Sequence, residues 1–130
     1  MVEIGGRPIL WHIMKIYARH GMSEFILCLG YRGNVIKEYL LNYEAMNNDF
    51  KICLGRQSHV QFMGAHPEQD FAVTPADIGL ETMTGGRLQR IGRYLENDET
   101  FLLAYGDGLS DVNIRYLVEL HASHGKVATV

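Results

Sequence analysis

The sequence predicts an α/β fold with a mostly parallel sheet. Apolar runs of about five residues, typical of buried strands, alternate along the chain with longer segments of helical periodicity. The turns between them are short, and strands that alternate with helices in this way form parallel sheets through right-handed crossovers. The 130 residues have room for one domain, and a hydrophobic content of 47% is normal for a globular core.

The first half of the chain predicts helix, strand, helix and strand in turn. Apolar residues at helical spacing predict a helix over residues 8–20, which begins at a proline and stops at Gly21. Residues 24–29 (EFILCL) predict a short buried strand. Asn34 is the expected N-cap of a second helix, and another strand is expected near residues 50–54.

The second half continues the alternation. Pro75 disfavours helix before it, so the preceding residues are expected to be extended. Asp111 is the expected cap of the last helix, and Gly125 its stop. The remaining expected elements are a candidate edge strand over 60–63, an extended segment over 71–74, a helix over 87–95, a strand over 101–105, a helix over 112–124 and the start of a strand over 126–130.

Composition narrows the class of protein. Twelve basic and 15 acidic residues give a net charge of −3 with no basic block, so non-specific nucleic-acid binding has no electrostatic support. No apolar run approaches the ~20 residues that span a bilayer, and no signal-peptide pattern opens the chain. We therefore expect a cytoplasmic protein that binds no membrane. Cys28 and Cys53 lie in apolar runs, which favours buried free thiols over a disulfide.

The most informative motif is the stretch 105–108 (YGDG), which ends the expected strand 101–105. In open α/β sheets, ligands bind beyond the carboxyl ends of the strands. At that place Asp107, between Gly106 and Gly108, can meet a cation and a polyphosphate without steric obstruction. The alternative is an ordinary strand-to-helix turn in which Asp107 bonds only to the backbone.

The second candidate site is the block 82–87 (TMTGGR), at the expected start of a helix. Free N–H groups and the helix dipole favour anions there, and Arg87 can bind phosphate oxygens bidentately. The alternative is a capping turn, with Thr84 as the cap and Arg87 solvated. No Gly-Lys-Ser/Thr follows, so the block is not a Walker A loop. Its candidate nucleotide- and substrate-binding residues are Thr82, Gly85, Gly86 and Arg87.

Other motifs indicate structure more than chemistry. His121 and His124 have the i, i+3 spacing of metal ligands, but no third ligand has clear spacing, which favours a solvated helix end. The segment 30–33 (GYRG) is expected to be a structural loop, with ligand contact as the alternative. No Ser-His-Asp or Cys-His set is recognisable.

Several blocks of the sequence together carry a family resemblance. Four blocks closely resemble the bacterial glucose-1-phosphate cytidylyltransferases, a family of sugar-nucleotide pyrophosphorylases: residues 1–14 (MVEIGGRPILWHIM), 29–33 (LGYRG) with 35–39 (VIKEY), 82–90 and 105–108. The resemblance covers essentially the whole chain and is weakest over residues 43–76. It implies a Rossmann-like three-layer α/β/α nucleotidyltransferase fold, of which residues 1–130 would be an interior fragment.

The resemblance also implies a reaction. CTP and α-D-glucose 1-phosphate would give CDP-glucose and pyrophosphate, for surface polysaccharide such as the lipopolysaccharide O-antigen, and the full-length enzyme would be a homo-oligomer. Asp107 would bind Mg²⁺, Gly106 would lie against the nucleotide, and Thr82 and Arg87 would contact it. Asp107 and Arg87 are thus the expected catalytic residues. A bridging cation offsets charge on the phosphates, and positioning supplies most of the remaining rate.

The sequence departs from the family in three ways. The glycine-rich GGxGTR loop with its KPKP segment, and a second metal-binding aspartate, are not among these 130 residues. Ile78 stands where the family usually carries threonine. We therefore expect that residues 1–130 alone make no CDP-glucose. The alternatives are a non-catalytic nucleotide-binding or assembly module, and a sibling enzyme that uses another base or sugar.

Overall fold

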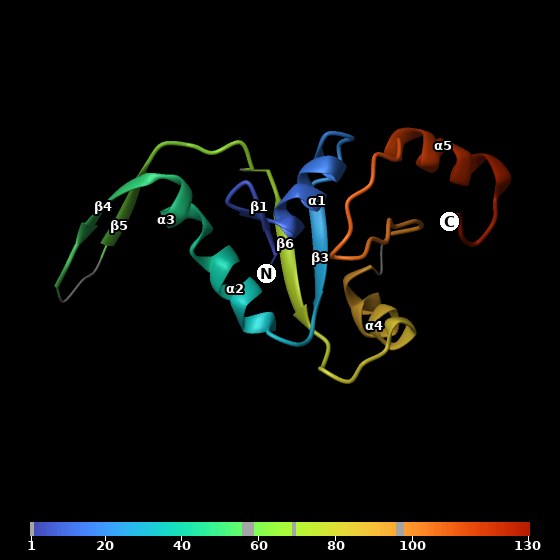
Figure 1. Ribbon diagram of the computed structural model, residues 1–130, viewed down its shortest axis with the longest axis horizontal. Coiled ribbons are helices and arrows are strands. Elements are labelled where there is room, and N and C mark those ends of the chain that lie inside the picture. Colours follow the sequence, from blue (N-terminus) through green and yellow to red (C-terminus); the bar gives the residue numbers. More distant parts are fainter. Residues whose placement is uncertain (1, 56–58, 69, 96–97) are drawn as a thin grey trace. The chain divides into compact units, whose positions relative to one another are not determined.

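The protein has a mixed α/β structure (Figure 1). The computed structural model describes residues 2–55, 59–68, 70–95 and 98–130. The chain divides into two compact units, Glu24–Glu99 on the one hand and Met1–Ser23 with Thr100–Val130 on the other. Within the described residues, the strands form three two-stranded sheets.

A parallel strand pair is the centre of the unit Glu24–Glu99. Strand β3 (Glu24–Leu29) pairs with β6 (Ala72–Asp77) over its whole length, and Leu29 lies opposite Asp77. The expected parallel pairing is therefore confirmed for these two strands. β6 contains Pro75, which is tolerated because β6 has a hydrogen-bonded neighbour on one side only in the described part of the chain. Because both strands end together, the loops that follow them leave the strand pair at the same end, beyond the carboxyl ends of the strands.

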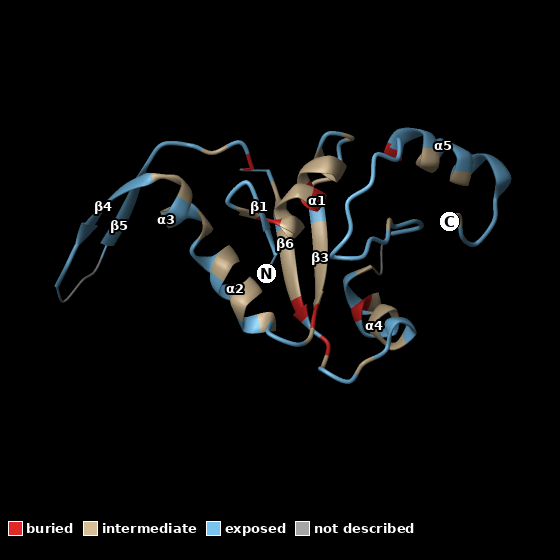
Figure 2. Cartoon of the chain, viewed as in Figure 1, coloured by how far each residue is buried: buried red, intermediate tan, exposed pale blue. Residues whose placement is uncertain are grey.

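The core of this unit lies where the helix α4 (Thr84–Ile91) meets the strand pair. Its buried side chains are Ala76, Ile78 and Ile91, and the partly buried residues packed against them are Ile26, Cys28, Leu88 and Leu95. A 3₁₀ turn, η1 (Gly92–Tyr94), continues the helix. Figure 2 shows the buried residues at the ends of β3 and β6 and in the loop beyond them. The helix expected over 87–95 thus begins three residues earlier, and Gly85 and Gly86 lie inside it.

Helix α2 (Gly33–Leu41) begins in a tight turn, not at the expected cap. Arg32 is the N-cap residue and has left-handed backbone angles, with φ +55°. The Gly33 N–H donates to the Gly30 carbonyl at 3.0 Å, and this turn starts the helix one residue before Asn34. Asn34 is therefore a helical residue and not the N-cap, so that prediction was wrong. A short helix, α3 (Tyr43–Asn47), follows and was not expected.

An antiparallel hairpin completes this unit. Strands β4 (Asp49–Cys53) and β5 (His59–Met63) pair along their whole length and are exposed at every position. Both strands were predicted, the second as an edge strand. Cys28 and Cys53 are free thiols as expected, but Cys53 is exposed because it lies in this hairpin.

In its described residues, the other unit contains two helices and a small hairpin. Strands β1 (Glu3–Ile4) and β2 (Arg7–Pro8) form the hairpin, and α1 (Ile9–Ala18) follows directly. Helix α1 and its stop at Gly21, which has φ +87°, agree with the prediction.

The second helix of this unit, α5 (Ile114–His124), has a different cap from the predicted one. The Asn113 Oδ1 accepts a hydrogen bond from the Tyr116 N–H at 3.1 Å, so the cap is Asn113 and not Asp111. Gly125, with φ +61°, ends the helix as expected. None of the helices in the described residues is both long and apolar enough to cross a membrane.

Residues 101–105 and 126–130 were predicted to be strands, and neither segment is one. A strand needs a hydrogen-bonded neighbour, and no described segment pairs with either of them. The apolar side chains of the first segment are accordingly exposed, with Phe101 at 47%, Leu103 at 57% and Tyr105 at 74%.

Candidate functional site

Arg87 is held at the carboxyl ends of the strand pair. It lies in the first turn of α4, and its Nε donates to the Thr82 carbonyl at 2.8 Å. Its Nη1 donates to the Cys28 carbonyl at 3.2 Å, which ties α4 to the end of β3 across 59 residues of sequence. The side chain is partly buried, so the alternative in which Arg87 is a solvated surface residue does not hold.

The rest of the Arg87 guanidinium is available to a ligand. A guanidinium has five N–H donors, and two are used by the Thr82 and Cys28 carbonyls. In the described part of the chain, the other three have no hydrogen-bond partner. Two bonds therefore fix the orientation of the group while the remaining donors can meet an anion.

Gly30, the first residue after β3, leaves room for this guanidinium. A Cβ atom on Gly30 would lie 3.0 Å from the Arg87 Nη2 and 3.4 Å from its Nη1. The distance to Nη2 is shorter than ordinary van der Waals contact, and the distance to Nη1 is at its lower limit. The 30–33 loop thus contributes to the site because Gly30 has no side chain. From the sequence, this segment was expected to be a structural loop, with ligand contact as the alternative.

The loop after β6 is organised around the Ile78 carbonyl. The Thr82 Oγ1 donates to this carbonyl at 2.6 Å, and the Arg90 Nη1 donates to it as well. Gly79 turns the loop at φ +87°, where a Cβ would lie 2.9 Å from the Arg90 Nη1. The Thr82 hydroxyl proton therefore goes to the backbone, and its oxygen lone pairs are left for other contacts.

Ile78 itself faces the core. Its side chain is 2% exposed and packs with Ala76 and Ile91. Ile78 thus contributes a packing side chain to the core and a carbonyl acceptor to the loop. Burial of this size favours an apolar residue over a hydroxyl.

The start of α4 has free backbone donors. Met83 is the N-cap residue, and it makes no side-chain capping bond. Thr84 is already the first helical residue, so the alternative in which Thr84 is the cap does not hold. The N–H groups of Thr84, Gly85 and Gly86 lie in the first turn, where an α-helix has no carbonyl partner for them. Free N–H groups at a helix N-terminus favour an anion.

Sequence reasoning missed Arg90 as part of this site. Arg90 follows Arg87 by three residues on α4, a spacing that places the two side chains on neighbouring positions of one helix face. That spacing is the signal that was available. What the spacing does not show is that the Arg90 guanidinium turns back to the Ile78 carbonyl.

Burial also changes the pKa of the Cys28 thiol, which lies near the Arg87 guanidinium. Burial raises the pKa of the Cys28 thiol, and the nearby Arg87 guanidinium lowers that pKa by a smaller amount. Cys28 is thus protonated at neutral pH and packs as a small apolar side chain.

Asp107 lies in the other unit, in an open turn. Gly106 and Asp107 form the turn, and Asp107 is exposed without a hydrogen-bond partner among the described residues. A Cβ atom on Gly106 or Gly108 would have nothing within 4 Å. The alternative in which the Asp107 carboxylate bonds only to the backbone finds no such bond in the structure. The carboxylate is open to a ligand from outside.

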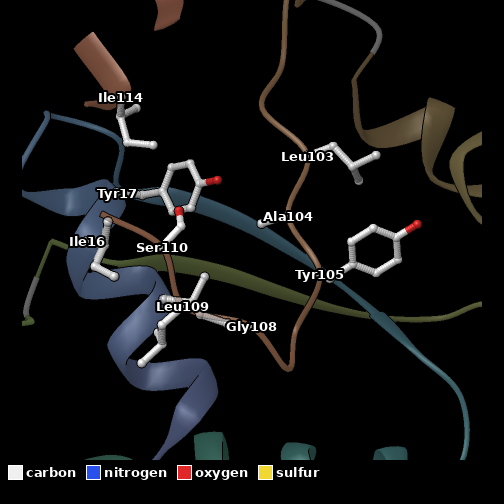
Figure 3. Close-up of a pocket in the computed structure, with 10 residues that line it drawn as sticks. Ile16, Tyr17, Leu103, Ala104, Tyr105, Gly108, Leu109, Ser110 and Ile114 are labelled. Atoms are coloured by element: carbon white, nitrogen blue, oxygen red, sulfur yellow. The ribbon is translucent and has the colours of Figure 1, made fainter. Parts of the chain in front are cut away.

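A pocket of about 300 Å³ lies beside this turn, within the same unit. Its lining is mostly apolar and comes from α1, from the segment 103–110 and from Ile114. Figure 3 shows that segment reversing direction between Tyr105 and Gly108, with Leu109 and Ser110 returning beside Ile16 and Tyr17 of α1. The turn that carries Asp107 closes one end of this loop but does not line the pocket.

The histidines at the end of α5 have a partner other than a metal. The His121 Nδ1 lies 2.9 Å from the Thr129 Oγ1, and the His124 Nε2 lies 2.8 Å from the same oxygen. In residues 2–55, 59–68, 70–95 and 98–130, no group of three His, Cys, Asp or Glu side chains is arranged to hold a metal ion.

Comparison with known proteins confirms the resemblance seen in the sequence. The chain is 46% identical over 132 aligned residues to the glucose-1-phosphate cytidylyltransferase of Salmonella typhimurium and 47% identical over 130 to a probable one of Bacillus subtilis. All of the chain is covered in both cases, and it spans 50% of the length of each relative. A mannose-1-phosphate guanyltransferase of Aspergillus oryzae is 27% identical over 131 residues, which is 30% of its length. No protein-family model matches the chain.

Proposed function

We propose that this chain is the nucleotide-binding part of an enzyme that makes CDP-glucose and pyrophosphate from CTP and α-D-glucose 1-phosphate. The observation that carries the proposal is the 46–47% identity to glucose-1-phosphate cytidylyltransferases across the whole chain. The geometry supports it, because Arg87 and the free N–H groups of α4 form an anion-binding edge beyond two parallel strands.

In this proposal Arg87 and the start of α4 hold the phosphates of CTP. The three unpartnered donors of Arg87 bind phosphate oxygens in a charge-assisted, planar arrangement. The N–H groups of Gly85 and Gly86 can approach the same ligand, because neither residue has a side chain of its own, and a Cβ on Gly85 would have nothing within 4 Å. The Thr82 hydroxyl oxygen keeps its lone pairs and is a neutral acceptor for the rest of the nucleotide.

Asp107 is proposed to carry the metal in the same reaction. Magnesium is usually held by one or two carboxylates together with substrate phosphates and waters. One exposed carboxylate in a turn that glycines keep open fits an ion that arrives with the nucleotide better than a permanent all-protein site. When bound, Mg²⁺ offsets the negative charge of the phosphates. Gly106 leaves space for the nucleotide next to the carboxylate.

In this reaction the protein mainly positions the two substrates and stabilises the charge on the phosphates. A phosphate oxygen of glucose 1-phosphate attacks the α-phosphorus of CTP, a new P–O bond forms, and the bond to the β-phosphate breaks. Pyrophosphate leaves with the electron pair. Arg87 stabilises negative charge on the transferring phosphate, and its two backbone bonds keep it in place so that little reorganisation is needed.

The finer fold follows from the same proposal. In the whole enzyme the β3–β6 pair would be part of a larger, Rossmann-like sheet between two layers of helices, and residues 101–105 would add a strand to it. The observation that supports this is the run of exposed apolar side chains along 101–105. Such a run is expected of a strand whose neighbouring strands are not among the described residues.

A transplant tests the function. In the Salmonella typhimurium relative, the stretch matched by this chain is replaced with residues 1–130, and pyrophosphate release is measured with each nucleotide and sugar phosphate. We expect release with CTP and glucose 1-phosphate, and little with GTP and mannose 1-phosphate. Residues 1–130 alone are expected to release none. A folded, inactive transplant, or one that prefers GTP, would overturn the proposal; circular dichroism shows whether it is folded.

A further inference from the structure

The β4–β5 hairpin carries an apolar face that nothing in the described chain covers. Phe50 lies opposite Phe62 and Ile52 opposite Val60, so these four side chains share one face. The rings of Phe50 and Phe62 are 6.0 Å apart between centroids. The four residues are 41–46% exposed. Figure 2 shows both strands exposed along their length. A two-stranded hairpin is marginal on its own in water, so a partner is expected.

The base of the hairpin is fixed to α3. The His66 Nε2 lies 2.7 Å from the Glu44 Oε1, and the Tyr43 hydroxyl donates to Glu68 at 3.1 Å. Glu68 is 7% exposed, so this contact is shielded from water. The segment that follows β5 is therefore held against α3.

The two edges of the hairpin differ in charge. β4 carries Asp49 and Lys51, whereas β5 (HVQFM) has no Asp, Glu, Lys or Arg and no proline. Natural sheets protect open edges with such charges, above all with lysine. The β4 edge is protected by this criterion and the β5 edge is not.

We propose that β5 is an interaction surface for a second copy of this chain, paired antiparallel about a two-fold axis at Gln61. In that register Val60 lies opposite the partner's Phe62, and His59 opposite the partner's Met63. Gln61 meets itself, so no like charges are brought together. The same operation on β4 would place Lys51 against Lys51, which is unfavourable. A two-fold interface needs one patch that complements itself, and β5 is such a patch.

The pairing makes a four-stranded sheet from two hairpins. Each β5 gains a neighbour for its open edge, and the Phe62 and Val60 side chains of both copies come together in the middle of one apolar face. Aromatic and β-branched cross-strand pairs are favourable in antiparallel sheets. The proposal does not depend on the reaction, because no residue of the candidate site belongs to the hairpin.

Charge at position 61 tests the proposal on residues 1–130. We expect sedimentation to give a dimer for the unaltered chain and a dissociation constant at least tenfold higher for both Gln61→Lys and Gln61→Glu. An equimolar mixture of the two variants should regain the dimer, because opposite charges then face each other. Lys51→Gln is the matched control on the opposite edge and should leave the dimer unchanged.

A cross-link gives an independent measurement. Directly opposite residues of antiparallel strands have Cα atoms about 4.5–5.5 Å apart, which is within reach of a disulfide. With the exposed Cys53 replaced by serine, Gln61→Cys should form a covalent dimer on oxidation and Lys51→Cys should not. A monomeric unaltered chain, equal masses for all variants, or equal cross-linking at both positions would overturn the proposal.

Discussion

At the start of α4, the Arg87 guanidinium donates hydrogen bonds to two backbone carbonyls, whereas the Asp107 carboxylate, in the other unit, is exposed and has no such partner among the described residues. Gly30 is crowded by a side chain, and Gly106 has open space around it. The surroundings of Arg87 are therefore organised by the protein alone. The turn that carries Asp107 is open, and a ligand and its cation would complete it.

The largest expected effect is at the open turn. Asp107→Asn keeps the size of the side chain but removes the charge that a cation needs, so turnover of the transplant protein should fall about 100-fold or more. Its melting temperature should not change, since Asp107 bonds to nothing in the described structure. Asp111→Asn, another exposed carboxylate nearby, is the control and should keep normal turnover. Near-normal turnover of Asp107→Asn at saturating Mg²⁺ would rule out the metal role.

Arg87→Lys should weaken CTP binding despite the conserved charge. An ammonium has three donors on one nitrogen and no planar fork, so it cannot keep both carbonyl bonds and also bind phosphate bidentately. Loss of one charge-assisted hydrogen bond of about 1.5–3 kcal/mol corresponds to at least a tenfold loss of affinity. Calorimetric titration of CTP into the transplant protein measures it. Arg93→Lys is the exposed control, and equal affinities for both variants would contradict the phosphate role.

A pair of glycine variants compares the two regions directly. Gly30→Ala places a Cβ 3.0 Å from the Arg87 Nη2, and overpacking of this kind costs about 1 kcal/mol. Gly106→Ala meets no atom within 4 Å, so its effect on stability should stay within about 0.5 kcal/mol. Urea unfolding of residues 1–130 measures both. Equal losses of stability would mean that the Arg87 region is no more tightly built than the turn.

The smallest expected effect is a pH dependence at Cys28. Because burial raises the pKa of this thiol in the folded state, the folded protein binds a proton that the unfolded chain loses first. Stability is therefore constant below the ordinary thiol pKa of ~8.5 and declines as the pH rises above it. Unfolding of the Cys53→Ser chain, with and without Cys28→Ala, should show this decline only where Cys28 is present. A decline that persists without Cys28 would assign it to another group.

Local signals predicted most elements but not their exact beginnings. The strand at 24–29 and the helix stops at Gly21 and Gly125 follow from apolar runs and from the freedom of glycine, both of which are local properties. The predicted caps at Asn34 and Asp111 were wrong. A turn at Arg32 begins the first of these helices, and the Asn113 side chain caps the second. Cap preference alone does not decide between adjacent polar residues.

The candidate residues could be chosen from sequence, but their contacts could not. Asp107 and Arg87 were identified from motif and resemblance, whereas Arg90 was missed because its carbonyl partner lies 12 residues away. The segment 101–105 was predicted to be a strand from its apolar run, and it is not one, because a strand requires a pairing that a single segment cannot supply.

The sequence by itself determined the α/β character of the chain, the identity of its charged candidates and the family that it resembles. These rest on residue type and short-range spacing, which are present in the unfolded chain. Only the tertiary structure decided that Cys28 and Thr82 would hold one guanidinium between them and that Gly30 would make room for it. The physical reason is that these contacts join residues up to 59 positions apart. Such contacts exist only after β3, β6 and α4 have packed, and that packing also decides which donors remain for a ligand.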